Sequence, residues 1–195
     1  EGGLTEEELA QYMPEPYEAP EYVPSPIPQD RDSAPATSAA PIKTKKGGAG
    51  TENLKSAYQY FVSQGFAPHQ AAAIVGNLAQ ESAGRTTAVG GNVLPNDPHS
   101  VGLGQWNRER LYGGKGYVGL IPFAKQRGSS PEDLQTQLDY VMQELHGPER
   151  AAYNRLMQAG SLEEATRAFG KAYERPREKY ANYGNRIAQA RKYLG

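Results

Sequence analysis

The distribution of proline limits which part of this chain can fold. Eight of the fifteen prolines fall within residues 14–41, in runs such as PEPYEAPEYVPSPIP. Each proline fixes φ and removes a backbone donor, and few residues here could bury apolar area, so we expect an extended, polyproline-rich segment. We therefore predict two parts: an acidic, Pro-rich linker or docking arm over residues 1–50, with composition favouring the linker, and one folded domain over residues 51–195.

The charge changes at the same boundary. Residues 1–50 carry nine acids and four bases, a net −5, so the total of −1 leaves +4 on the rest of the chain. A mildly basic body suits a polyanionic partner such as nucleic acid or bacterial cell wall. Within the acidic part, Thr5 and Glu8 stand in capping-box register and allow one short helix over residues 5–13. The chain starts with Glu1 rather than Met, which we interpret as a processed product or a piece of a larger virion protein.

Several chemistries are disfavoured by what the sequence lacks. With no cysteine, a disulfide, a thiolate nucleophile and a zinc knuckle are excluded. The three histidines, His69, His99 and His146, have no ligand spacing, so we expect no metal and no cofactor. The GGKG at 113–116 lies in no strand–helix unit and is predicted to be a turn. No apolar run approaches the ~18–20 residues of a membrane span.

Apolar spacing in the body predicts a mainly α fold. Pro68 is placed to open a helix whose apolar stripe includes Ile74 and Leu78. Other helices are expected over roughly 51–65, 106–126 with a break at YGGKGY, 131–145, 148–160, 161–169 and 178–193. Residues 83–105 have no helical period and are rich in Gly and Pro, which indicates a long loop or a small hairpin. Such a loop in a compact domain is typical of a binding or catalytic element.

Glu81 is the candidate catalytic residue. It follows Leu78 by three positions and Ile74 by seven, so on a helix it shares their apolar stripe. Desolvation there, and the negative end of the helix dipole, both favour a carboxyl group that keeps its proton, as a general acid must. The alternative is a carboxylate that reaches water or pairs with a neighbour such as Arg85. Spacing alone leaves both alternatives open.

Three segments in the same order resemble a known family. GNLAQES (76–82), VGLGQW (101–106) and AFGKAYERP (168–176) are similar to signature segments of the phage tail lysozymes, which belong to the lysozyme-like group with goose-type lysozymes and soluble lytic transglycosylases. The resemblance spans roughly residues 51–194. It implies a lysozyme-like helical domain with a small loop or hairpin lobe. It also implies cleavage of the β-1,4 bond between N-acetylmuramic acid and N-acetylglucosamine in peptidoglycan.

The resemblance assigns roles to the first two segments. Glu81 maps to the catalytic acid, and Ser82 to a serine that helps to hold the local backbone or the carboxylate. Gly102, Leu103 and Gln105 map to the Gly-Leu-x-Gln segment that lines the cleft. There Gln105 is expected to bond to substrate or to orient the acid.

Three aromatic and acidic residues carry open alternatives. Trp106 is expected to offer a sugar-stacking face or to anchor the core. Tyr173 and Glu174 map to the late YERP segment, at the substrate side of the family's site. Glu174 could be a second acid, an ion-pair partner or a structural cap, and the neighbouring Arg175 and Arg177 favour a structural role.

The second carboxyl group is less well defined. Glycosidases generally use two, ~5–5.5 Å apart for retention or ~6.5–9.5 Å for inversion. Asp97 is the first candidate by its place in the loop, although Asp before Pro is ordinary in turns. Glu109 and Glu174 follow. Lytic transglycosylases manage with one glutamate because the substrate assists, so hydrolysis and this intramolecular route both remain open.

Two other function classes compete with the enzyme. One is a non-catalytic glycan-binding or structural module of a phage tail or ejection protein. The other is nucleic-acid binding by residues 167–192, which hold eight bases and two acids but match no recognised motif, so we place it last. The preferred hypothesis is a virion-associated enzyme acting on the bacterial wall, joined to other tail proteins through residues 1–50 or a larger parent chain.

Overall fold

The computed structural model describes residues 50–90 and 100–194 of the 195-residue chain. The predicted linker, its short helix over 5–13 and the candidate Asp97 lie outside these ranges. In chain order the elements are α2 (Gly50–Ser63), α3 (Pro68–Ser82), β1 (Val89–Gly90), β2 (Ser100–Val101), α4 (Arg108–Tyr112), α5 (Leu120–Gln126), α6 (Leu134–His146), α7 (Arg150–Gln158), α8 (Leu162–Phe169), a π-helical turn η1 (Gly170–Glu174), a 3-10 turn η2 (Glu178–Tyr180) and α9 (Tyr183–Arg191). The predicted mainly α fold is confirmed.

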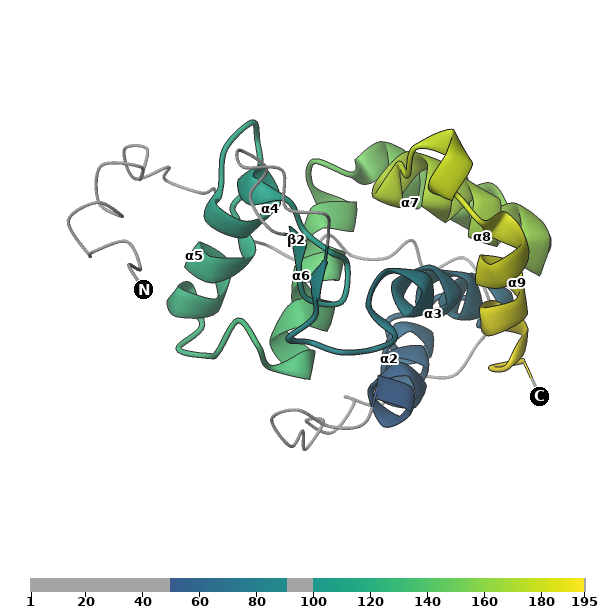
Figure 1. Cartoon of the computed structure of the whole chain (residues 1–195), viewed down its shortest axis with the longest axis horizontal. Helices are drawn as coiled ribbons and strands as arrows, with labels where there is room; N and C mark the ends of the chain where they lie inside the picture. The colour runs from purple at the N-terminus through teal and green to yellow at the C-terminus, as the bar shows by residue number, and fades with distance from the viewer. Residues whose placement is uncertain (1–49, 91–99, 195) are drawn as a thin grey trace.

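Helix α3 is the central element. Pro68 occupies its first turn, as predicted, and Ala67 precedes it in an extended conformation. Its residues from Ala71 to Val75 are fully buried, because α2, α8 and α9 all pack against it. Figure 1 shows α3 with α8 and α9 on one side of α6 and α4 and α5 on the other side, with the small sheet overlapping α6 in the middle of the view. The last turn of α3 thus lies where the two sides of the molecule meet.

The contact between α3 and α9 is unusually close at Gly76. A Cβ atom at this position would lie 2.5 Å from the carbonyl oxygen of Arg186 and 2.6 Å from Cβ of Ala190. Only a residue without a side chain allows the two backbones to approach to this distance. The approach brings the side chain of Arg186 alongside the final turn of α3, which carries Glu81.

The segment between α3 and α4 contains the small hairpin. Strands β1 and β2 pair antiparallel, with Val89 opposite Val101 and Gly90 opposite Ser100. Val101 also forms an isolated bridge with Trp106, which folds the intervening residues into a tight turn. Of the two predicted alternatives, a long loop or a hairpin, the described residues form the hairpin.

Helix boundaries differ from the prediction where local hydrogen bonds compete. Helix α6 begins at Leu134 because residues 131–133 form a turn, in which the Ser130 hydroxyl accepts from the Glu132 amide at 3.2 Å. The last helix begins at Tyr183 because Asn182 adopts a left-handed conformation with φ of 43°. None of the helices within the described ranges combines the length and apolar character that a membrane crossing requires.

Replacing Gly76 by Ala should destabilise the fold. The added methyl group meets backbone atoms of α9, and overpacking of this kind costs about 1–3 kcal/mol of the free energy of unfolding. Gly184→Ala on α9 is the matched control, because its Cβ would meet nothing within 4 Å and should leave stability unchanged or raise it by up to about 1 kcal/mol. Urea denaturation measures both; equal effects would show that the close approach carries no cost.

Candidate functional site

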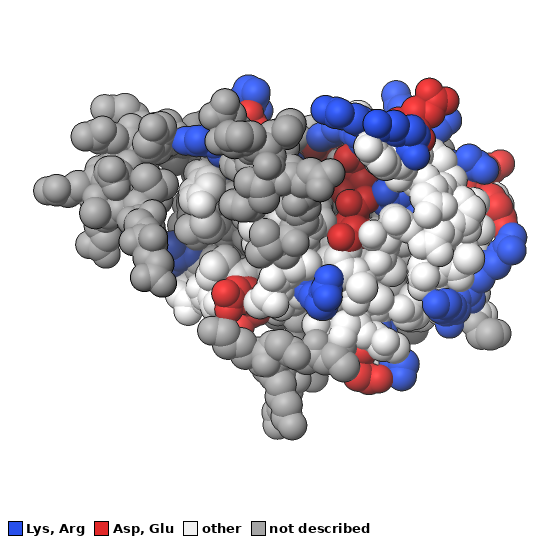
Figure 2. All heavy atoms as spheres, viewed as in Figure 1, with Lys and Arg blue, Asp and Glu red and all other residues white. Residues whose placement is uncertain are grey.

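A pocket of about 720 Å³ opens at the end of α3. Its lining residues come from α3, the β2–α4 segment, α4, the α4–α5 loop and the end of η1: Glu81, Ser100, Gly104, Gln105, Asn107, Glu109, Arg110, Lys115, Tyr117, Glu174 and Arg175. Figure 2 shows acidic side chains in a hollow near the middle of one face, between the side that holds α4 and α5 and the side that holds α3 and α9. The pocket is therefore polar, with carboxyl groups and cations brought together from distant parts of the sequence.

Glu81 is held in this pocket by an ion pair. Nη2 of Arg186 donates to Oε1 of Glu81 at 2.6 Å, and the Glu81 side chain is 22% exposed whereas that of Arg186 is 2% exposed. The partner is Arg186, 105 residues along the chain, rather than the Arg85 considered from sequence. The pair fixes one carboxyl oxygen of Glu81 and places a cation in contact with it, in place of the purely apolar surroundings that the helix stripe predicted.

Arg186 is itself fixed by the helices around it. Its Nε donates to the carbonyl of Ala181 at 2.7 Å, and its Nη1 donates to Oδ1 of Asn77 at 3.1 Å. Asn77 in turn donates to the carbonyls of Ala73 and Thr166, at 2.9 and 3.1 Å. A buried cation with each group directed at an acceptor is rigid, so the carboxyl group of Glu81 has a defined orientation.

Ser82 holds the end of α3. Its buried hydroxyl donates to the carbonyl of Leu78 at 3.0 Å and accepts from the amide of Gly84 at 3.1 Å. This geometry matches the backbone-holding role that the resemblance implies, and no contact with Glu81 is needed for it.

The Gly-Leu-x-Gln segment forms a turn at one wall of the pocket. Gly102 has a φ of 81°, and a Cβ there would lie 2.8 Å from the Trp106 ring. Gln105 also adopts positive φ, and its side-chain amide donates to the carbonyls of Ala88 and Gly102 at 3.1 and 2.9 Å. Gln105 lines the pocket. It is thus braced against the hairpin while remaining beside Glu81.

Leu103, Trp106 and Tyr173 lie behind the pocket rather than in it. All three are 0% exposed. Of the two alternatives for Trp106, the structure shows the core anchor: its ring packs edge-on against Tyr140, and its indole N–H donates to Oε2 of Glu144 at 3.0 Å. Because they are buried, these side chains have no face open to a glycan. The contact with substrate that was predicted for them is therefore replaced by a supporting role behind the pocket.

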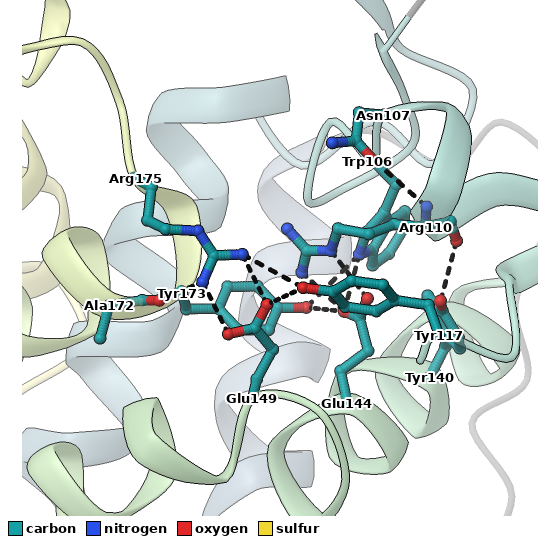
Figure 3. Close-up of polar contacts among 10 residues, drawn as sticks. All are labelled: Trp106, Asn107, Arg110, Tyr117, Tyr140, Glu144, Glu149, Ala172, Tyr173 and Arg175. Atoms are coloured by element: carbon teal, nitrogen blue, oxygen red, sulfur yellow. Dashed lines mark hydrogen bonds and ion pairs between the residues drawn. The ribbon is translucent and has the colours of Figure 1, made fainter. Parts of the chain in front are cut away.

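Glu144 organises a buried network under the pocket floor, drawn in Figure 3. Arg110 binds it in a bidentate manner, with Nε to Oε1 at 2.7 Å and Nη2 to Oε2 at 2.6 Å. The Tyr173 hydroxyl donates to the same carboxylate, and the Arg110 guanidinium lies 4.3 Å from the centre of the Tyr173 ring. The network joins α4, α6 and η1, so it fixes the two sides of the pocket relative to each other.

A further carboxylate, Glu149, binds two residues that line the pocket, Tyr117 and Arg175. Arg175 donates to both of its oxygens, at 2.8 and 2.6 Å, and the Tyr117 hydroxyl also donates to it (Figure 3). Burial alone would raise the pKa of Glu149, but the hydrogen bonds from Arg175 and Tyr117 lower it overall. The side chains link the α4–α5 loop to the residue after η1.

Glu174 lies beside Glu81 without an ion-pair partner of its own. Its Oε1 is buried and has no hydrogen-bond partner among the described residues, and the neighbouring Arg175 is committed to Glu149. Burial raises the pKa of Glu174 to about 8, and the negative charge of Glu81 adds to the rise. The pairing with neighbouring arginines that favoured a structural role is therefore not seen for Arg175.

Glu109 also lines the pocket, but it differs from Glu174. Nζ of Lys115 donates to its Oε1 at 2.7 Å, and this hydrogen bond lowers the pKa of Glu109. It is an exposed anion at the rim. Asp97 lies outside the described residues.

The structure thus brings together Glu81, Gln105 and Glu174 from the three sequence segments. Sequence reasoning missed Arg186, Glu144 and Glu149, which are far from those segments. In the described part of the chain, His, Asp and Glu side chains form no group of three or more that could hold a metal ion.

A polar pocket lined by several carboxyl groups, here Glu81, Glu109 and Glu174, is typical of glycoside-cleaving enzymes. The family model of the phage tail lysozymes matches residues 52–195, and the chain belongs to this family. The resemblance predicted from sequence is confirmed. Membership supports an enzyme of phage tail origin that acts on peptidoglycan. No curated protein matches the chain.

Removing the charge of Glu144 should strongly destabilise the protein. Glu144→Gln leaves the buried Arg110 without its counterion, and breaking a buried pair from one side costs about 3–5 kcal/mol of the free energy of unfolding. Glu163→Gln breaks the exposed pair with Arg191 and should change stability little. Urea denaturation compares the two variants, and similar losses would contradict the organising role given to Glu144.

Glu174 should make stability depend on pH. Its pKa rises from an ordinary 4.5 to about 8, so the folded protein holds an extra proton between these values. Its contribution to stability is fully present below the lower value and is lost as pH rises through the upper one, by up to about 1.4 kcal/mol per pH unit. Glu174→Gln cannot titrate, so the variant should gain on wild type from about pH 5 to about pH 8 in urea denaturation. A constant difference would contradict this.

Proposed function

We propose that this protein cleaves the β-1,4 bond between N-acetylmuramic acid and N-acetylglucosamine in peptidoglycan, with Glu81 as the general acid. The observation that carries the proposal is the position of Glu81, on the last turn of a buried helix, at a pocket shared with Gln105 and Glu174. Membership of the family supports peptidoglycan as the substrate, and the residues of the pocket support cleavage by a general acid.

The geometry suits proton transfer to a bound glycan. Arg186 engages Oε1 of Glu81, and among the described residues this is the hydrogen bond that Glu81 makes, which leaves Oε2 for the glycosidic oxygen. Gln105 and Asn107 also line the pocket, and Oε1 of Gln105 and Nδ2 of Asn107 take no part in the hydrogen bonds described above, so they can bond to sugar hydroxyls and acetamido groups. Protonation of the bridging oxygen lets the bond to C1 break, with oxocarbenium character at C1.

After the glycosidic bond breaks, the reaction can be completed in two ways. A water molecule gives a reducing end, and the 6-hydroxyl of the same muramic acid gives a 1,6-anhydro end. Both routes use the same general acid, and the proposal includes both.

The setting that we propose is a phage virion. A tail-associated enzyme of this kind would open the wall locally during delivery of the genome into the cell. Residues 1–50, or a larger parent chain, would join the domain to other tail proteins. The net charge of +4 on the remainder of the chain supports attraction to anionic wall polymers.

Glu81→Gln should abolish the clearing of a purified peptidoglycan suspension. The amide keeps the shape of the side chain but cannot donate a proton as an acid, so the rate should fall by about 100-fold or more. Glu52→Gln, on the exposed surface of α2, is the control and should clear the suspension at the wild-type rate. Far-UV circular dichroism checks that both variants remain helical. An active Glu81→Gln protein would end the proposal, and wild-type binding without clearing would favour a glycan-binding module.

A further inference from the structure

The position of Glu174 is not explained by the role of Glu81 as the general acid. Its Oε1 is buried without a hydrogen-bond donor in the part of the chain that the structure describes. An ionised carboxylate oxygen that is buried without a protein donor is costly, although the residue as a whole is only partly buried. The residue nevertheless reaches the same pocket as Glu81.

The groups around Glu174 decide where a proton resides. Burial raises the pKa of Glu174 to about 8, and the charges of Glu81 and Glu144 act in the same direction, while those of Arg110 and Arg186 oppose the rise. The hydroxyl of the adjacent Tyr173 is directed to Glu144. Arg110 and Arg186, the cations in the described ranges whose charges act on Glu174, are thus bound to other carboxylates, Glu144 and Glu81.

Glu81, in contrast to Glu174, has a cation in contact with its carboxyl group. The hydrogen bond from Arg186 at 2.6 Å stabilises its negative charge. Two neighbouring carboxyl groups do not ionise independently, because the first charge disfavours the second. Glu174, which has no cation partner among the described residues, is therefore the better placed of the two to hold a proton.

We propose that Glu174 is a positioning residue that keeps the proton of the site and supplies it to Glu81 during catalysis. This inference rests on the proposed function. It explains how Glu81 can act as an acid although it faces Arg186. It also gives a role to a buried carboxyl group that no ion pair or hydrogen bond otherwise accounts for.

Each proton that moves in the proposed step has a donor and an acceptor. As the glycosidic bond breaks, the proton on Glu174 passes to the carboxylate of Glu81, and Glu81 protonates the leaving oxygen, which takes the electron pair of the C1–O bond. The nucleophile, water or the 6-hydroxyl, then bonds to C1 and returns its proton to the pair. No further reactant is required.

The pH profile of peptidoglycan clearing tests the role of Glu174. Glu174→Gln removes the stored proton, so its activity at pH 7 should fall at least about tenfold and should recover toward acid pH, where the solvent can supply the proton instead. Glu174→Asp keeps a carboxyl group and should restore activity at pH 7. A uniform loss in Glu174→Gln, with the pH limits of wild type, would overturn the proposal.

A second measurement observes the proton itself, and its first result needs only the wild-type protein and no measurement of activity. Infrared spectra of wild-type protein with ¹³C-labelled glutamate should show the C=O stretch of a protonated carboxyl group at pH 7. The band should persist in Glu52→Gln and disappear in Glu174→Gln. Wild-type protein without this band would overturn the inference and leave the proposed function standing. A band in a protein that releases no glycan fragments would instead reject the proposed function.

Discussion

The guanidinium of Arg186 lies buried between α3 and α9, where it contacts Glu81, Asn77 and the carbonyl of Ala181. A buried cation is tolerated only when acceptors surround it, so these contacts specify how the last helix docks onto the central one. The absence of a side chain at Gly76 permits the close approach of the helices. The same ion pair that fixes the docking of α9 also fixes the candidate general acid, which links the stability of the fold to the geometry of the site.

The other wall of the pocket depends on two further carboxylates. Glu144 binds Arg110 from α4 and Tyr173 from η1, and Glu149 binds Arg175 directly after η1. These contacts hold the residues directly before and after Glu174, at the end of the short π-helical turn. Turns of this kind are frequent at functional sites because they shift the register of the side chains that follow. Here Glu174 and the following Arg175 both reach the pocket, Glu174 without a cation partner among the described residues and Arg175 in an ion pair with Glu149.

Sequence periodicity predicted the helices well, and it placed Glu81 at a helix end. It could not identify Arg186, since a hydrophobic stripe shows which face is buried but not which distant side chain meets it. For Glu174, the adjacent Arg175 suggested an ion pair. The amide of Arg175 instead bonds to the carbonyl five residues earlier, at 2.8 Å, and its side chain reaches Glu149. Trp106 stayed ambiguous because sugar stacking and core packing use the same apolar ring.

The proposed function requires that the protein cuts glycan strands at one bond, the β-1,4 bond between N-acetylmuramic acid and N-acetylglucosamine. Mass spectrometry of the fragments released from purified peptidoglycan by the wild-type protein measures this directly. The account predicts fragments that end in N-acetylmuramic acid, with either a reducing or a 1,6-anhydro end at C1. Fragments that end in reducing N-acetylglucosamine, newly cut stem peptides, or no soluble fragments at any pH would contradict it.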